Sequence, residues 1–450
     1  MNPQIFRAYD VRGVADVDLT DDVALALGRA YAAEIIAAGG KRVTLGRDCR
    51  LHGPRLRAAF ATGLLESGLD VIDVGVVPSP LLYFSVFHHD ADGGVQITGS
   101  HNPSNYNGFK MMQGKASLHG EAIQRLRTRM ETTDFVSGSG QLTEAPIFDD
   151  YVAYVTENIT LGDRPLRVVV DGGNGTGGPS AVAILERLGV EVIPKFIEMD
   201  GRFPNHHPDP TVAENLQDLI SAVRETKADL GVAYDGDADR IGVVDETGEI
   251  IWGDRLMILL SRAILAENPG AAIVSEVKCS QTLFDDIAAH GGRPIMSQVG
   301  HSIIKERMLQ EKSLLGGEMS GHIFFKHRWF GFDDAVYTTM RLLEIVSRTD
   351  APLSSLFEDV PKTHVTPEIR LPCPDDTKFG VVDKAVSHFK ASFPVIDIDG
   401  ARIDFGDGWG LIRASNTQPV IVLRAEADSS EALTRIRTTL EGFVASGGGM

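Results

Sequence analysis

The sequence predicts an α/β protein with three similar α/β units, which have mixed sheets, followed by a smaller C-terminal α+β unit. Three observations lead to this prediction. Stretches with helical periodicity alternate with short apolar stretches typical of buried strands through most of the chain. The chain has 450 residues, which is too long for one ordinary domain. From about residue 362 the pattern changes to extended segments around two helices.

The first unit begins with a helical pattern from Asp21 to Ala38, which the pair Gly39-Gly40 ends. The segment RVTLGRD follows as a strand, and a second helical pattern covers residues 53–68. The strand patterns DVIDVG and GGVQIT complete the alternation. Because strands separated by helices usually lie parallel in one sheet, we expect helices on both faces of that sheet.

The alternation starts again after about residue 150 and once more near Asp254. The second round predicts strands at 166–171, 190–196 and 229–235, with helices at 179–188 and near 213–226. The third round predicts strands at 271–277, 293–297 and 313–318, with a helix at 281–289. The last unit contains strand patterns at 402–406, 410–415 and 420–427. We therefore expect domains at residues 1–147, 148–250, 251–361 and 362–450.

Composition narrows the class of protein. The chain is 43% hydrophobic and 23% charged, as soluble globular proteins are. Its net charge of -19 disfavours nucleic acid and acidic membranes, which bind mainly through lysine and arginine. No apolar run is long enough to cross a bilayer, and the N-terminus lacks a signal core, so we expect a cytoplasmic protein. Its three cysteines are expected to be reduced and structural.

The segment AYDGDADRIGVVDETGEI places Asp235, Asp237 and Asp239 at alternate positions. Bringing such carboxylates together costs about 3 kcal/mol per pair, which a hard cation such as Mg²⁺ or Ca²⁺ would offset. A solvated acidic turn is the structural alternative. An EF-hand is excluded because Arg240 occupies the sixth position, where that loop needs glycine. The following IGVVDETGEII is typical of a hairpin.

The segment VVVDGGNGTGGPS matches G-x-G-x-x-G through Gly173, Gly175 and Gly178. A dinucleotide site would need an acidic residue at the end of the next strand, but Lys195 and Phe196 stand there. A glycine-rich turn between a strand and a helix is the better interpretation. The chain contains no G-x-x-x-x-G-K-[ST], so a P-loop kinase is unsupported.

Three other loops carry candidate chemistry. In QITGSHNPSNYNGFK, Ser100 follows a strand and stands among turn-forming residues. Ser-His-Asp hydrolysis is disfavoured because the strained G-x-S-x-G turn is absent, whereas a hydroxyl that only caps a turn stays open. In RASNTQP, Arg413 can contact an anion through two N–H groups. Uncharged donors beside it suit a phosphate: Ser415, Asn416 and Thr417.

In GGEMSGHIFF, three polar residues alternate in a segment that we expect to be extended: Glu318, Ser320 and His322. Alternation would place them on one side, where they could bind sugar hydroxyls. The structural alternative for RASNTQP is a plain turn, and the structural alternative for GGEMSGHIFF is a polar edge strand. A nucleophile loop, a cation loop, a hydroxyl-binding loop and an anion loop, one from each unit, together resemble a phosphoryl-transfer site between domains.

Six longer motifs run in order along essentially the whole chain: FRAYDVRG, TGSHNPSNYNGFK, DGDADR, GEMSGH, KHRWFGFDD and GWGLIRASNTQPVIVLR. In this order they resemble the α-D-phosphohexomutase family, and within it the bacterial phosphomannomutase/phosphoglucomutase branch. The resemblance implies four domains around a deep central active-site cleft. It also implies an isomerase that reversibly interconverts the 1- and 6-phosphates of mannose and glucose.

By the same resemblance, Ser100 would be carried as phosphoserine, and one Mg²⁺ per chain would be held by Ser100, Asp235, Asp237 and Asp239. The phosphoserine would phosphorylate a hexose monophosphate, and the resulting 1,6-bisphosphate would turn around and return its other phosphoryl group. Glucose 1,6-bisphosphate would thus be both activator and intermediate.

The resemblance also implies the remaining site residues. The catalytic residues would be Ser100, His101, Lys110, Arg240 and His322. The substrate-binding residues would be Tyr9, Arg12, Lys278, His301, Glu318, Ser320, His322, Arg413, Ser415, Asn416 and Thr417. His101, Lys110 and His322 are the candidates for proton transfer and charge stabilisation, and the choice of general base stays open.

One departure is visible, because Ala238 stands where most members have glycine, so the loop is either strained or not left-handed there. GEMSGH favours mannose and glucose phosphates over the same-class alternative, a phosphoglucosamine mutase. A catalytically idle sugar-phosphate-binding protein is the other alternative, and it would be expected to have lost the serine or the aspartates. We expect a monomer whose partners are small hexose phosphates, not nucleic acid or membranes.

Overall fold

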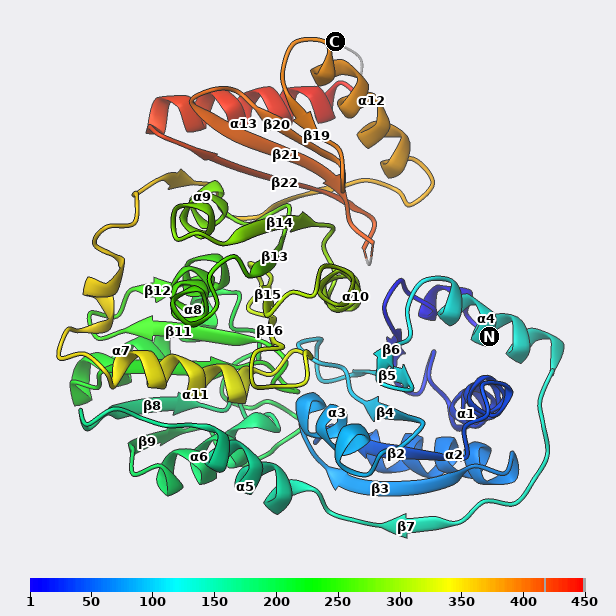
Figure 1. Ribbon diagram of the computed structural model, residues 1–450. Helices are drawn as coiled ribbons and strands as arrows, with labels where there is room; N and C mark the ends of the chain where they lie inside the picture. The colour runs from blue at the N-terminus through cyan, green and yellow to red at the C-terminus, as the bar shows by residue number, and fades with distance from the viewer. Residues whose placement is uncertain (417, 448–450) are drawn as a thin grey trace.

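The computed structural model describes residues 1–416 and 418–447. Its strands form four separate sheets that follow one another along the described chain. Figure 1 shows each sheet with its own helices: the first domain at the lower right, the second and third on the left, and the fourth at the top. The predicted fold class, three α/β units and a different last unit, is confirmed.

The first domain contains a mixed sheet in the order β1-β5-β4-β2-β3-β7, with β6 beside β5. Its strands are β1 (Val11–Val14), β2 (Arg42–Arg47), β3 (Asp70–Val76), β4 (Gly93–Ile97), β5 (Tyr106–Gln113), β6 (Ala116–Ser117) and β7 (Leu142–Glu144). Its helices are η1 (Pro3–Ile5), α1 (Asp21–Ala37), α2 (Gly53–Glu66), α3 (Ser79–His88) and α4 (Glu121–Thr132). Val71 and Ile72, adjacent on β3, pack into different apolar clusters, because α1 and α2 cover one face and α3 the other.

The second domain has the sheet order β12-β11-β10-β8-β9. Its strands are β8 (Arg167–Asp171), β9 (Glu191–Lys195), β10 (Leu230–Tyr234), β11 (Ile241–Asp245) and β12 (Ile250–Ile251), and its helices are α5 (Phe148–Asn158), α6 (Gly177–Arg187), η2 (Ala213–Leu216) and α7 (Gln217–Thr226). The hairpin predicted for IGVVDETGEII is confirmed by the antiparallel pair β11 and β12. Strand β12 contains the predicted boundary between residues 250 and 251, and the exact boundaries stay predictions.

The third domain has the sheet order β14-β13-β15-β16. Its strands are β13 (Ala272–Glu276), β14 (Arg293–Ser297), β15 (Leu315–Gly317) and β16 (Ile323–Phe325), and its helices are α8 (Gly253–Glu267), α9 (Gln281–Ala289), α10 (His301–Glu311), α11 (Ala335–Val346) and η3 (Leu353–Phe357). The extended segment expected in GGEMSGHIFF is wrong, because β15 and β16 form a hairpin around residues 318–322. Gly321, with φ of 87°, supplies the left-handed position that this turn needs.

The fourth domain is an antiparallel sheet in the order β17-β22-β21-β20-β19, with β18 beside β22. Its strands are β17 (His364–Val365), β18 (Ile369–Pro372), β19 (Val395–Ile396), β20 (Ala401–Asp404), β21 (Gly408–Ala414) and β22 (Val420–Ala427). Its helices α12 (Lys378–Lys390) and α13 (Ser430–Ala445) share one apolar cluster with the sheet. The two helices therefore cover the same face, as Figure 1 shows.

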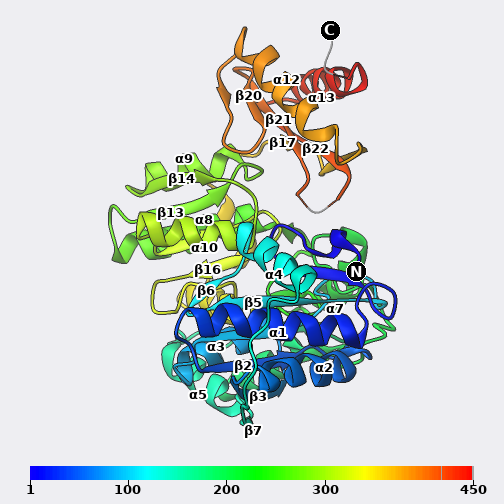
Figure 2. The ribbon, with the colours of Figure 1, turned by 90° about the vertical axis from the view of Figure 1, so that its right-hand side faces the viewer.

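One apolar cluster runs through the first three domains, from α3 through α5 and α8 to the loop that contains Trp329. The fourth domain has a core of its own, and Figure 2 shows it standing above the other three. Its contact with the third domain is partly polar and partly apolar: Arg402 donates to the carbonyl of Cys279 at 2.9 Å, and Trp409 packs with Val277. The first three domains thus form one packed body to which the fourth is joined.

Two further expectations concern the redox state of the cysteines and the absence of a helix that crosses a membrane. All three cysteines lie in the described chain and are free, which agrees with their expected reduced state. Among the described helices, none combines the length and the apolar character that crossing a bilayer requires.

Candidate active site

Ser100 lies in the loop that follows β4 and leads to β5. Its side chain is buried, and its φ of 48° places the backbone in the left-handed region. Ser100 Oγ donates to Asp235 Oδ2 at 2.7 Å and lies 3.1 Å from Nδ1 of His101. The structure therefore brings the serine loop of the first domain against the acidic loop of the second.

The three aspartates of that acidic loop lie together in the turn between β10 and β11, and all three are fully buried. One oxygen atom from each lies within 4.8 Å of the others. Oδ1 of Asp237 and Oδ1 of Asp239 have no hydrogen-bond partner among the described residues. Because a buried carboxylate oxygen without a partner is costly, this donor set fits a metal ion.

Lys110, on β5, reaches the same carboxylates. Its Nζ donates to Asp237 Oδ2 at 2.6 Å and also to Asp239. Burial alone would lower the pKa of Lys110, but these carboxylates raise it well above its ordinary value. Burial and the two neighbouring carboxylates also raise the pKa of Asp235 well above its ordinary value. One ammonium among three carboxylates leaves an excess of negative charge, which a divalent cation would balance.

His322 connects the acidic loop to the third domain. Nε of Arg240 donates to Nε2 of His322 at 2.9 Å. Because arginine can only donate, Nε2 is the acceptor, and a neutral His322 ring carries its proton on Nδ1. That Nδ1 lies 3.1 Å from Asp333 Oδ2 and 3.6 Å from Asp239 Oδ1. The imidazole is thus held between a cation on one side and carboxylates on the other.

Asp333 is a site residue to which the sequence analysis gave no role. Its carboxylate is fully buried, pairs with Lys305 at 3.1 Å and faces Nδ1 of His301 at 3.7 Å. Although burial opposes it, the charge of Lys305 and the contact with the His322 ring lower the pKa of Asp333 well below its ordinary value. The motif KHRWFGFDD contains this aspartate and was the available signal, but spacing within the motif indicates no chemistry for it.

Glu318 and Ser320 lie in the turn of the β15–β16 hairpin. The turn is closed by the N–H of Glu318, which donates to the carbonyl of His322 at 2.9 Å. Oε1 of Glu318 accepts from the N–H of Gly300, the residue immediately before His301, at 2.6 Å. Oε2 of Glu318 accepts from Ser320 Oγ at 3.2 Å. Although the segment is not extended, the turn places Glu318 at the start of α10, beside His301.

Tyr9 contacts the third and fourth domains from the first. Its hydroxyl donates to the carbonyl of Val299 at 2.7 Å and accepts from Nδ2 of Asn416 at 2.9 Å. The rings of Tyr9 and His301 meet edge to face, with centroids 5.8 Å apart. Burial raises the pKa of Tyr9 to about 12, so its hydroxyl is neutral. Through Tyr9, these contacts bring the loop that contains Asn416 toward the start of α10.

The other predicted cations are paired with carboxylates of the chain itself. Lys278 Nζ lies 3.1 Å from Glu368, and Arg413 Nη2 lies 3.1 Å from Asp399. An anionic ligand at either cation would compete with these carboxylates. Arg12 is also paired, through Nη2 to Oδ2 of Asp10 at 2.5 Å, and its Nη1 donates to Oδ1 of Asn102 in the serine loop at 2.7 Å.

The described part of the anion loop is held by hydrogen bonds within the loop and by Lys378, whose Nζ donates to the carbonyls of Ser415 at 2.6 Å and Gln418 at 3.0 Å. The N–H of Ser415 donates to the carbonyl of Val420 at 3.0 Å, and Oγ of Ser415 accepts from the N–H of Gln418 at 3.1 Å. Thr417, also predicted to bind phosphate, lies outside the described residues.

The glycine-rich loop of the second domain packs behind the acidic loop. A Cβ on Gly175 would lie 2.7 Å from the carbonyl oxygen of Gly236, and one on Gly177 would lie 2.5 Å from Cβ of Ala238. Close packing therefore accounts for these glycines without a dinucleotide. Ala238 has φ of 56°, so of the two possibilities for this residue the structure has the strained, left-handed one.

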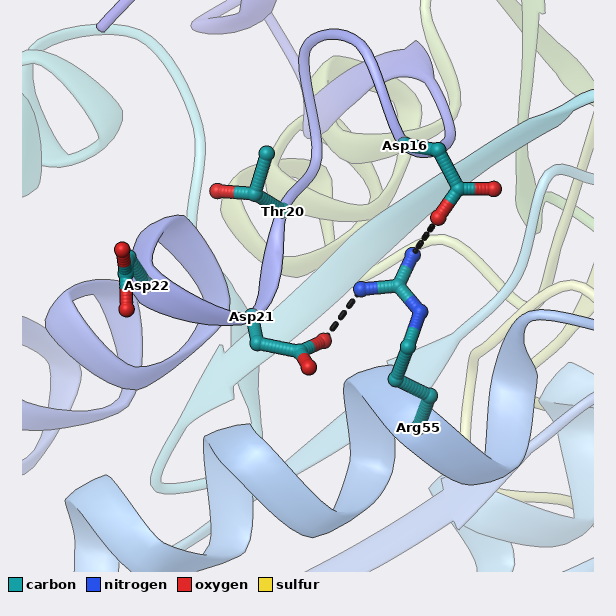
Figure 3. Close-up of a pocket in the computed structure, with 5 residues that line it drawn as sticks. All are labelled: Asp16, Thr20, Asp21, Asp22 and Arg55. Atoms are coloured by element: carbon teal, nitrogen blue, oxygen red, sulfur yellow. Dashed lines mark hydrogen bonds and ion pairs between the residues drawn. The ribbon is translucent and has the colours of Figure 1, made fainter.

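A hollow of about 420 Å³ lies on the first domain (Figure 3), and its lining contains none of the predicted site residues. Its lining residues are Asp16, Thr20, Asp21, Asp22 and Arg55. Arg55 donates to Asp16 at 2.6 Å and to Asp21, so the pocket's cation is neutralised by its own carboxylates. We assign the chemistry instead to the buried groups around Ser100.

Comparison with known proteins agrees with this architecture, which is that of the α-D-phosphohexomutases. Four family models match in order: phosphoglucomutase/phosphomannomutase α/β/α domains I, II and III at residues 3–137, 149–248 and 252–364, and the C-terminal domain at 368–442. The chain therefore belongs to the phosphoglucomutase/phosphomannomutase family.

Individual relatives cover nearly the whole chain. A phosphomannomutase/phosphoglucomutase of Pseudomonas putida is 48% identical over 96% of this chain and 94% of its own. A phosphoglucomutase of Neisseria gonorrhoeae is 46% identical over 98% of this chain and 97% of its own. The crystal structure of a phosphoglucomutase/phosphomannomutase family protein from Burkholderia thailandensis superimposes with a TM-score of 0.94 at 43% identity, covering 99% of this chain and 98% of that one.

Proposed function

We propose that the protein reversibly transfers phosphoryl groups between the 1- and 6-positions of mannose and glucose phosphates, with Ser100 as phosphoserine and a hexose 1,6-bisphosphate as intermediate. The contact between Ser100 Oγ and Asp235, 2.7 Å long and inside a buried group of carboxylates, carries this proposal. The names of the P. putida and N. gonorrhoeae relatives support the choice of sugars. A phosphoglucosamine mutase, the alternative, is not favoured by these names.

In the forward half-reaction, the bond from the serine oxygen to phosphorus breaks while a sugar hydroxyl oxygen bonds to the same phosphorus. The sugar hydroxyl gives its proton to a base, and the departing Oγ of Ser100 takes up a proton, so that Ser100 is left as a free hydroxyl. The return half-reaction reverses these changes at the other end of the sugar. Lys110 and Arg240, whose side chains contact the aspartates and His322, are placed to stabilise charge on the moving group. His101, Lys110 and His322 stay the candidates for proton transfer, and the choice of base stays open.

Asp235, Asp237 and Asp239, with one phosphoserine oxygen, would hold Mg²⁺, which would neutralise negative charge on the transferred group. The bisphosphate must bind in two opposite orientations, so the groups that hold it must accept either end. Glu318 and Ser320 would bind ring hydroxyls in both orientations. The phosphate that is not reacting would be held by Arg413, Ser415, Asn416 and Thr417.

Mannose 1-phosphate and glucose 1-phosphate are expected to be converted with kcat/KM values within about tenfold of each other. The two sugars differ only in the orientation of the hydroxyl at C2, and hydroxyl contacts from Glu318 in two poses cannot discriminate strongly. A coupled assay with a trace of glucose 1,6-bisphosphate compares both with glucosamine 1-phosphate. A strong preference for the glucosamine substrate would replace this assignment with the alternative.

Substituting Asp333→Asn is expected to lower kcat about 100-fold with little change in KM. The amide keeps the volume of the side chain but removes the negative charge that orients His322 through Nδ1, 3.1 Å away. Steady-state kinetics with glucose 1-phosphate measures the effect. Asp245→Asn is the control, since Asp245 is a buried aspartate that caps the β11–β12 turn through Thr247. An Asp333→Asn enzyme with wild-type kcat would show that the contact between Asp333 and His322 has no role in catalysis.

A further inference from the structure

Arg50, in the loop between β2 and α2, has a completely buried guanidinium. A guanidinium has five N–H groups, and here each one has an acceptor. Nε donates to Asp48 Oδ2 at 3.1 Å. The other four bonds go to backbone carbonyls of the serine loop: Pro103 at 2.6 Å and Tyr106 at 3.0 Å from Nη1, and Ser100 at 2.7 Å and Asn102 at 2.6 Å from Nη2. One side chain thus holds the loop from residue 100 to residue 106.

Asp48 holds the other side of Ser100. Its Oδ2 accepts from Thr98 Oγ1 at 2.8 Å and from the N–H of Gly99 at 3.2 Å. Thr98 Oγ1 in turn accepts from the N–H of Ser100 at 2.9 Å. The peptide groups before and after Ser100 are therefore both tied to the same buried ion pair.

This arrangement explains the backbone of Ser100. A residue with a Cβ at φ near +50° costs about 1–2 kcal/mol and persists only when its surroundings fix it. The carbonyl of Ser100 lies against the acidic loop, since a Cβ on Gly236 would come within 2.5 Å of its oxygen. The position of that carbonyl, which Arg50 holds, thus helps to set how closely Ser100 approaches the aspartates.

The second domain covers the guanidinium, because Phe203 lies with its ring centre 5.1 Å from Arg50 Cζ. The pocket left for the side chain is narrow. A Cβ on Gly99 would lie 2.5 Å from Arg50 Cζ, and one on Gly201 would lie 2.5 Å from Arg50 Cα. A lysine could carry the same charge here but could not reach four carbonyls with one nitrogen atom.

We propose that Arg50, with Asp48 as its anchor, is a positioning residue for phosphoryl transfer: it keeps Ser100 in the left-handed conformation that directs its hydroxyl at Asp235. This inference rests on the proposed function of Ser100. Arg50 does not touch the reacting atoms and acts through the loop backbone. A buried ion pair present only for stability is the alternative, and such pairs contribute little net stability compared with apolar residues of similar size.

The test compares Arg50→Lys with the full-length wild type. Misplacing a reacting group by about 1 Å costs on the order of 100-fold, so kcat and the single-turnover rate of Ser100 phosphorylation by glucose 1,6-bisphosphate should fall by about that factor, while KM stays within about threefold. Arg341→Lys is the matched control, since Arg341 is a buried arginine that donates to the carbonyl of His327 at 3.0 Å, outside the serine loop. It should lower the melting temperature without lowering kcat.

A folded Arg50→Lys enzyme with wild-type kcat and phosphorylation rate would overturn the positioning role. If Arg50→Lys does not fold, comparing the kcat values of Thr98→Val and Thr98→Ser tests the positioning role instead. Valine keeps the shape but loses both bonds of Thr98 Oγ1, whereas serine keeps a hydroxyl there, so serine should recover most of the kcat that valine loses. Equal kcat in both variants would also overturn the role. Failure of the proposed function looks different, since the wild type itself would then carry no phosphate and show no turnover.

Discussion

The substitution Ser100→Ala is expected to remove the covalent phosphate from the protein and to lower kcat at least about 10⁴-fold. No other described hydroxyl donates to Asp235, and the contact of Ser100 Oγ with that carboxylate is only 2.7 Å long. The alanine has the same Cβ and meets the same left-handed strain, so the fold should persist with the loss of about one hydrogen bond.

Two measurements check this result together. The intact mass of the purified wild type should include a fraction heavier by one phosphate, which disappears in Ser100→Ala, and the coupled assay should show no turnover by the variant. Ser104→Ala is the control, because Ser104 is an exposed serine of the same loop. An unphosphorylated Ser100→Ala protein with full activity would falsify the phosphoserine mechanism.

Local sequence patterns predicted most strands of the first three sheets and helices α1, α2, α6, α7 and α9, but not helices α4 and α5. The strands and helices of the second domain follow the expected alternation closely, and helix α9 has the predicted bounds. Helix α3 was not predicted because it has no polar face: its sequence SPLLYFSVFH is buried along most of its length, between the first sheet and the cores of the next two domains. A pattern without a polar side carries no helical period.

The candidate site divides in the same way. Ser100 and the three aspartates could be predicted from residue type and spacing within single loops. Asp333 and Arg50 do not, because their importance comes from neighbours far away in the chain: Asp333 lies against His322 and His301, and Arg50 binds carbonyls that have no side-chain signature. The hairpin at Glu318 was missed for a related reason, since alternation of polar residues does not distinguish a strand from a tight turn containing glycine.

The loops of the candidate site are supported by two separate apolar cores. The loops that contain Ser100, Asp235 and Glu318 belong to domains that share one apolar core, so their mutual distances are fixed by packing. The anion loop belongs to the fourth domain, whose core is separate, and it meets the first domain through the bond from Asn416 to Tyr9. A site that must accept a sugar in two orientations gains from this division, because chemistry requires rigid groups while phosphate binding tolerates adjustment.

Removing divalent metal with EDTA is expected to lower kcat at least about 10³-fold, and adding Mg²⁺ should restore it. The reason is the charge of the site: three fully buried aspartates face one lysine, and two of their oxygens have no partner among the described residues. Adding phosphate to Ser100 brings further negative charge to the same place, so without a cation neither the phosphoenzyme nor the moving group is stabilised.

The second readout of this prediction does not depend on activity. A cation that binds only the folded protein at 100 times its dissociation constant adds about 2.7 kcal/mol to the free energy of unfolding, so Mg²⁺ should raise the melting temperature of the stripped protein. Asp237→Asn should weaken both effects, because it removes one negative ligand and leaves Lys110 in place, whereas Asp245→Asn should leave both intact. Full turnover after rigorous chelation, with no change in melting temperature on adding Mg²⁺, would mean that Lys110 and Arg240 alone balance the charge.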